Sequence, residues 1–181
     1  RGVSGYVTMN PVTKDLLARS DNRLINLDRG LGTKMGNVVC LRWMLVDVDA
    51  EREEGISATQ EELDRALAAR DAILDDYPML RDSAMWGCSG NGGWILIRLA
   101  DLPNDDEHKD LIARVLAGLS RRYTTVLVEI DQKPKDLPRI WKLYGTTARK
   151  GEATEERPHR VAWMVSGEPW NDHPTCVSPV L

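Results

Sequence analysis

The apolar run at residues 38–48 constrains the fold of this chain more than any other stretch. Its side chains are apolar in both alternating sets, with Trp43 and Leu45 in one set and Met44 and Val46 in the other. Successive side chains of a strand point to opposite faces of a sheet, so this strand needs cover on both sides. The run therefore predicts a central strand, and a chain of 181 residues can supply the layers that cover it.

The run ends in Asp47 and Asp49, two carboxylates one residue apart. Residues i and i+2 of a strand share a face, so the two side chains are expected to project side by side from the end of the strand. Carboxylate oxygens held in this way suit Mg²⁺ or Mn²⁺. Acidic residues also end strands for structural reasons, because they favour turns. From this stretch alone, both interpretations stay open.

Strands and helices alternate further along the chain. Thr59 and Glu62 fit a capping box, which predicts a helix that ends at Tyr77-Pro78. Short strands are expected at residues 83–88 and 94–99, a second helix near Asn104, and a strand at residues 125–131. This alternation predicts an α/β (α+β) fold, in which helices pack on a sheet.

Composition narrows the class of protein. No apolar run approaches the length of a membrane span and no leader opens the chain, so we expect no membrane partner. Cys40, Cys88 and Cys176 are far apart and form no C-x-x-C pair, which argues against a disulfide framework or a zinc site and favours the cytoplasm. Because the chain begins with Arg1 instead of Met, we expect a fragment of a larger protein.

Charge is unevenly distributed although the net charge is only −4. Acidic residues dominate residues 47–82, whereas basic residues dominate residues 133–160. A local basic face is therefore compatible with the acidic total.

A third carboxylate, Asp131, ends a later predicted strand, and a glycine-rich turn lies at residues 89–93 between two others. In two-metal chemistry, carboxylates bridge two ions about 3.5–4 Å apart, which activate a hydroxyl and stabilise a leaving phosphate oxygen. Asp47, Asp49 and Asp131 are residues of the type that this chemistry needs.

The sequence resembles the primase-polymerase (prim-pol) branch of the archaeo-eukaryotic primase superfamily, found on phages, on plasmids and in bacterial replication proteins. The resemblance spans nearly the whole chain, in order, at residues 43–49, 55–59, 89–92, 102–106, 139–146 and 149–151. It implies one catalytic domain over residues 1–181, with a two-lobed core and a catalytic sheet like that of an RNA-recognition fold. It also implies polymerisation of nucleotides with two divalent ions, Mg or Mn.

Carried over onto this chain, the resemblance implies catalytic metal ligands at Asp47, Asp49 and Asp131. It implies nucleotide contacts at Ser89, Asn91, Trp94, Arg139 and Lys142. Strand alternation puts Arg98 on the same face as Trp94 and adds it to the expected nucleotide-binding residues. The implied partners are a DNA template and primer, nucleoside triphosphates, and a fused or associated helicase.

Trp94 stands where relatives usually have a histidine that contacts the triphosphate. An indole donates one N–H and stacks, but it carries no positive charge. Arg98, Arg139 and Lys142 are the residues expected to compensate, and Trp94 either stacks on a base or sugar or packs in the cleft wall. The expected function is a nucleotidyltransferase that adds nucleotides to a 3′ hydroxyl on a DNA template. The alternative is a weakened or inactive domain that binds nucleic acid or nucleotides.

Overall fold

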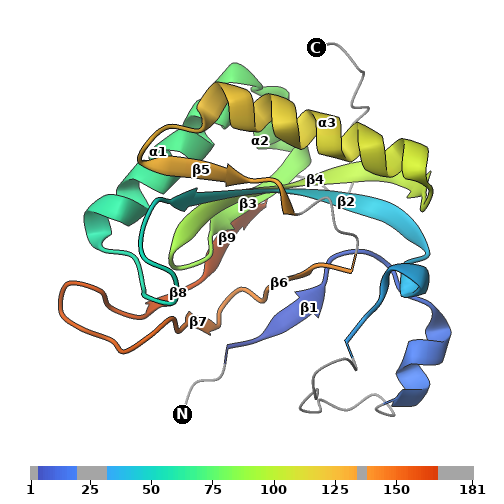
Figure 1. Cartoon of the computed structure of the whole chain (residues 1–181), viewed down its shortest axis with the longest axis horizontal. Helices are drawn as coiled ribbons and strands as arrows, with labels where there is room; N and C mark the ends of the chain where they lie inside the picture. Colours follow the sequence, from blue (N-terminus) through green and yellow to red (C-terminus); the bar gives the residue numbers. More distant parts are fainter. Residues whose placement is uncertain (1–3, 20–31, 134–137, 167–181) are drawn as a thin grey trace.

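A computed structural model describes residues 4–19, 32–133 and 138–166, and its centre is a five-stranded antiparallel sheet (Figure 1). The sheet has the order β5-β2-β4-β3-β9. Its strands are β2 (Cys40–Ala50), β3 (Ala84–Cys88), β4 (Gly92–Pro103), β5 (Val128–Asp131) and β9 (Trp163–Ser166). The predicted central strand is therefore confirmed, because β2 pairs with β4 on one side and β5 on the other.

Helices cover one face of this sheet, and two short ribbons lie on the other side (Figure 1). The helices are α1 (Gln60–Asp76), α2 (Met79–Ser83) and α3 (Asp106–Tyr123). The ribbons are β1 (Tyr6–Thr8) with β6 (Ile140–Lys142), and β7 (Thr147–Ala148) with β8 (Arg160–Val161). Two 3-10 helices, Lys14–Arg19 and Met35–Asn37, complete the described elements. The α+β fold class, with helices on a sheet, is thus confirmed.

Apart from the short helix α2, which precedes β3, the order β2-α1-β3-β4-α3-β5 is a split βαβ arrangement, which places its first and third strands, β2 and β4, at the centre. Separate hydrophobic cores cover the two faces of the five-stranded sheet. Val46, Val48 and Ile130 pack under the helices. Leu45 and Trp94 pack on the opposite face. Apolar side chains in both alternating sets of β2 are what this two-sided burial requires.

The helix starts follow from capping chemistry. Thr59 Oγ1 accepts a hydrogen bond from the Glu62 N–H at 3.1 Å, and the Glu62 carboxylate accepts one from the Thr59 N–H at 2.9 Å, so the predicted capping box is present. The cap of α3 is Asp105, whose carboxylate accepts from the His108 N–H. Asn104 donates to the Val38 carbonyl at 2.8 Å, and the helix begins at Asp106, near the predicted position.

Two other boundaries differ from the predicted ones. β5 begins at Val128 instead of residue 125, because Thr125 Oγ1 accepts from the N–H groups of Leu127 and Val128 and holds a turn there. β4 runs on to Pro103. Cys176, one of the three cysteines of the sequence, lies outside the described residues. In the described ranges no helix is both long and apolar enough to cross a membrane.

Gly87 in β3 gives a test of how closely β9 packs against this strand. A Cβ atom there would lie 2.2 Å from the Trp163 carbonyl oxygen and 2.7 Å from Trp94 Cζ2. We expect Gly87→Ala to lower the free energy of unfolding by about 2 kcal/mol in urea, because the backbone of β9 must move.

The matched control is Gly36→Ala, since a Cβ at Gly36 would meet nothing within 4 Å. We expect this variant to equal the parent or to gain about 0.5 kcal/mol. Equal stability of the two variants would contradict the close packing of β9 against Gly87.

Candidate functional site

A cleft of about 210 Å³ opens on the sheet face opposite the helices. The sheet contributes Leu45, Asp47, Asp49 and Trp94, and the β3–β4 turn contributes Ser89 and Asn91. Opposite them lie side chains of β6, the residues on either side of it, and the beginning of the β7–β8 connection, among them Arg139, Lys142, Arg149 and Lys150. The cleft thus brings together segments from both ends of the described chain.

Carboxylates form a row along one face of β2 and β5. Asp47 is the register partner of Asp131, and Asp49 is the partner of Glu129. Directly opposite residues of antiparallel strands have Cβ atoms about 4.5–5.5 Å apart, so Asp47 and Asp131 are side-by-side neighbours. Asp131 is outside the cleft lining but pairs with Arg139, which is in it. The three predicted carboxylates are therefore brought together.

Glu129 is a fourth carboxylate that sequence analysis did not select. It lies two residues before Asp131, so strand alternation alone places both on the same face. Its side chain is exposed at the edge strand of the sheet.

The central carboxylate of the row is held in an unfavourable environment for charge. Burial, and then the charges of Asp49 and Asp131, raise the pKa of Asp47 to about 8. Asp49 accepts from Arg52 Nη2 at 3.2 Å, and Asp131 accepts from Arg139 Nη2 at 3.0 Å. Among the described residues no donor hydrogen-bonds to the Asp47 carboxylate. The two outer carboxylates therefore have cationic partners, and the central one lacks a partner of its own.

Asp47, Asp49 and Asp131 suit a metal ion by the chemistry of their oxygen atoms and less by their arrangement. In residues 4–19, 32–133 and 138–166, no three Asp, Glu, His or Cys side chains are placed to bind one ion. The oxygen-only donor set matches Mg²⁺ or Mn²⁺, and a cation beside Asp47 would relieve the repulsion that raises its pKa. Arg52 contacts one oxygen of Asp49 and Arg139 one oxygen of Asp131, and a carboxylate has acceptor sites on both oxygens.

Gly92 lets the Asp49 carboxylate lie across β4. A Cβ at Gly92 would be 2.6 Å from Asp49 Oδ1 and 2.5 Å from the Val48 carbonyl oxygen. Gly92 closes the β3–β4 turn, in which the Ser89 N–H donates to the Gly92 carbonyl at 2.9 Å and the Gly92 N–H donates to Ser89 Oγ at 3.1 Å. Asn91 Oδ1 accepts from the buried Ala58 N–H at 2.8 Å. Ser89 and Asn91 thus shape the turn and also line the cleft.

Trp94 is a packed part of the cleft wall. Its side chain is 3% exposed, stacks on Tyr144 with ring centroids 4.6 Å apart, and meets the Trp141 ring edge-on at 4.5 Å. Of the two alternatives for Trp94, the structure favours packing, since its ring has little free face for a base. The indole N–H of Trp94 and the hydroxyl of Tyr144 are buried without a hydrogen-bond partner in the described residues. Burial and the nearby Asp47 raise the pKa of Tyr144.

Four cationic side chains line the cleft. Arg139 and Lys142 lie where the resemblance implies nucleotide contacts, and Arg149 and Lys150 were not selected as site residues although their block belongs to the resemblance. Lys142 Nζ donates to the Thr147 carbonyl at 2.8 Å, and burial lowers its pKa.

Arg98 departs from its predicted place. Its guanidinium donates to Asp101 at 2.9 Å and lies over the Trp43 ring, 5.6 Å from the centroid. It does not line the cleft. Arg98 shares a sheet face with Trp94, as alternation predicts, but it lies four residues further along β4, which is about 13 Å.

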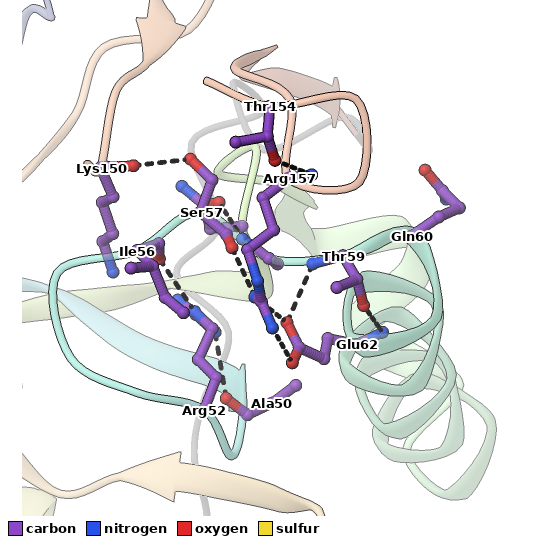
Figure 2. A network of polar contacts seen from close by, with 12 residues as sticks. Ala50, Arg52, Ile56, Ser57, Thr59, Gln60, Glu62, Lys150, Thr154 and Arg157 are labelled. Carbon is purple, nitrogen blue, oxygen red and sulfur yellow. Dashed lines mark hydrogen bonds and ion pairs between the residues drawn. The ribbon is translucent and has the colours of Figure 1, made fainter. Parts of the chain in front are cut away.

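A strap, residues 149–159, joins β7 to β8 and carries Arg149 and Lys150 to the cleft. Arg157 anchors it with two hydrogen bonds to the Glu62 carboxylate, at 2.8 and 3.0 Å, and one to the Ser57 carbonyl at 2.8 Å (Figure 2). Ser57 Oγ donates to the Lys150 carbonyl at 3.0 Å (Figure 2). Because Glu62 also takes part in the capping box of α1, Arg157 fixes the strap to the beginning of this helix.

Comparisons with protein-family models, with curated proteins and with solved structures found no match to this chain.

The raised pKa of Asp47 predicts a pH-dependent cost to stability. In the unfolded chain an aspartate releases its proton near pH 3.9, whereas folded Asp47 retains it to about pH 8. The free energy of unfolding therefore falls as the pH rises through this window. With a chelator present, we expect Asp47→Asn to be roughly 2 kcal/mol more stable than the parent near pH 8, allowing for water that still reaches the side chain.

This advantage should shrink toward pH 4, where the parent also holds the proton. Urea unfolding at both pH values measures it, and Asp64→Asn on the exposed face of α1 is the control that should show no such trend. An Asp47→Asn effect that is the same at both pH values would contradict the perturbed carboxyl group.

The anchoring of the strap predicts a local effect of Arg157→Met. Loss of the bonds to Glu62 and Ser57 should raise amide hydrogen exchange in the strap on the order of tenfold, with little change in α3. Arg65→Met is the matched control. Arg65 also pairs with a glutamate of α1, Glu61, but this pair lies on the exposed surface of the helix and does not involve the strap. Unchanged exchange in the strap of Arg157→Met would show that other contacts hold it.

Proposed function

We propose that this protein is a metal-dependent nucleotidyltransferase of the prim-pol type, which adds nucleotides to a 3′ hydroxyl on a DNA template. One observation carries the proposal: Asp47 is the register partner of Asp131, with Asp49 two residues further on, beside a cleft lined by four cations. Carboxylates and cations serve different parts of a nucleoside triphosphate and its metal ions, and a site for phosphoryl transfer needs both.

The carboxylates Asp47, Asp49 and Asp131 are the proposed ligands for two Mg²⁺ or Mn²⁺ ions. When bound, such ions polarise the α-phosphate and stabilise the developing charge on the attacking and leaving oxygens. Arg139 and Lys142 from one wall, and Arg149 and Lys150 from the strap, are the proposed contacts of phosphate oxygens, through charge-assisted hydrogen bonds, since all four line the cleft. Ser89 and Asn91 keep the β3–β4 turn in position beside them.

The proposed partners are nucleoside triphosphates and a DNA template and primer, with a fused or associated helicase. The proposed context is a domain of a larger replication protein in the cytoplasm. Basic side chains beside the cleft support the nucleic-acid part of this proposal, since they neutralise backbone phosphates whatever the net charge of the whole chain.

A second candidate function is nucleotide or nucleic-acid binding without turnover. It is favoured by Trp94, which offers no positive charge and is packed against Tyr144, and by the arginines that occupy Asp49 and Asp131. A domain of this kind would keep the cationic walls and make no product.

Primer extension with Mg²⁺ or Mn²⁺ tests the two candidates. We expect template-dependent extension by the parent, and a loss on the order of 100-fold or more in the variant that combines Asp47→Asn with Asp49→Asn, because the carboxylate charge is removed without a change of shape. Asp64→Asn should extend as the parent does.

Calorimetric titration with a nucleoside triphosphate separates the remaining outcomes. Binding by the parent without extension would support the second candidate, and extension that survives the double substitution would contradict the first. A parent protein that extends no primer and binds neither a nucleoside triphosphate nor a primed DNA template would contradict both candidates.

A further inference from the structure

The cleft is lined by both charged and aromatic side chains, and the charged ones include Asp47 and Arg139. Two lining side chains, Tyr6 at 55% and Ile140 at 56%, are mostly exposed and are called its rim here. A nucleotide offers a partner to each kind of side chain, because its phosphates are charged and its base is a flat ring that stacks.

Tyr6 and Ile140 are held on one face of the β1–β6 ribbon. Tyr6 pairs with Lys142 and Thr8 pairs with Ile140, and residues that are paired or two apart share a face. The ribbon is fixed further by the Leu143 N–H, which donates to the Gly5 carbonyl at 2.9 Å. The position of the Tyr6 ring is thus set by strand pairing and not by a free loop.

Lys142 Nζ lies over the Tyr6 ring, 5.1 Å from its centroid. A cation on one face of an aromatic ring is attracted by the ring and leaves the other face for stacking. Lys142 also lines the cleft, so the same side chain joins the aromatic rim to the phosphate-binding walls.

The other aromatic side chains of the cleft are unsuited to stacking on a ligand. Trp94 is 3% and Trp141 9% exposed, and Tyr144 is stacked on Trp94. Among the described aromatic residues that line the cleft, Tyr6 alone is mostly exposed.

We propose that Tyr6 is the platform on which the base of the bound nucleotide stacks, with the triphosphate directed inward to the cations of the cleft. This inference rests on the proposed function for the identity of the phosphate group. It assigns the stacking role that the sequence suggested for Trp94 to a different residue and a different element. It also fixes the orientation of the nucleotide, base at the β1–β6 rim and phosphates toward Asp47.

Calorimetry with two probes, dATP and inorganic tripolyphosphate, each with Mg²⁺, tests the platform. Loss of a base–aromatic stack weakens binding on the order of tenfold. We expect Tyr6→Ala to bind dATP about tenfold more weakly than the parent and to bind tripolyphosphate equally well. Tyr6→Phe keeps the ring and should bind both probes as the parent does.

Val7→Ala is the matched control, because Val7 neighbours Tyr6 on the opposite face of β1 and is also partly exposed. Equal weakening of dATP by Val7→Ala and Tyr6→Ala would overturn the inference, as would unchanged dATP binding by Tyr6→Ala. Parallel loss of both probes in Tyr6→Ala would also overturn it, since the ring would then act through Lys142. A parent that binds neither probe contradicts the proposed function itself, a result distinct from all of these.

Discussion

The register of β2 between β4 and β5 is the constraint on which the rest of the molecule depends. Side chains alternate along a strand, so a shift of one residue would turn Asp47 and Asp49 into the core beneath the helices and bring Val46 and Val48 to the cleft. Burial of Val46, Val48 and Ile130 therefore fixes where the carboxylates point. The pairing of β2 with β4 and β5 thus determines both the burial of the core and the geometry of the site.

That pairing also brings like charges close together. Three carboxylates share neighbouring positions, and Arg52 and Arg139 offset two of them while Asp47 stays without a hydrogen-bond donor among the described residues. A site that carries uncompensated charge lowers stability, and such a cost is commonly retained where function requires it. The Trp94 N–H and the Tyr144 hydroxyl, which are buried without a hydrogen-bond partner among the described residues, add to this cost.

Patterns in the sequence predicted the features that depend on residues close together in the chain. The capping box at Thr59, the two-sided strand that ends at Asp49 and the α+β class all depend on spacing along one element. Alternation also put Arg98 on the correct face, but a face says nothing about distance along the strand, and Asp101 holds this arginine away from the cleft. The packing of Trp94 and the anchoring of the strap by Arg157 depend on residues far apart in the chain, which periodicity cannot pair.

The β1–β6 ribbon has a consequence for the order in which the site is made during synthesis. The βαββαβ unit, with its row of carboxylates, is complete once Asp131 has left the ribosome. The rim cannot form until residues 140–142 emerge to pair with β1, and the strap that carries two of the four cations follows later still. A nascent chain thus holds an anionic sheet face before the basic segments arrive, so the cations at residues 139–150 dock onto a surface of opposite charge.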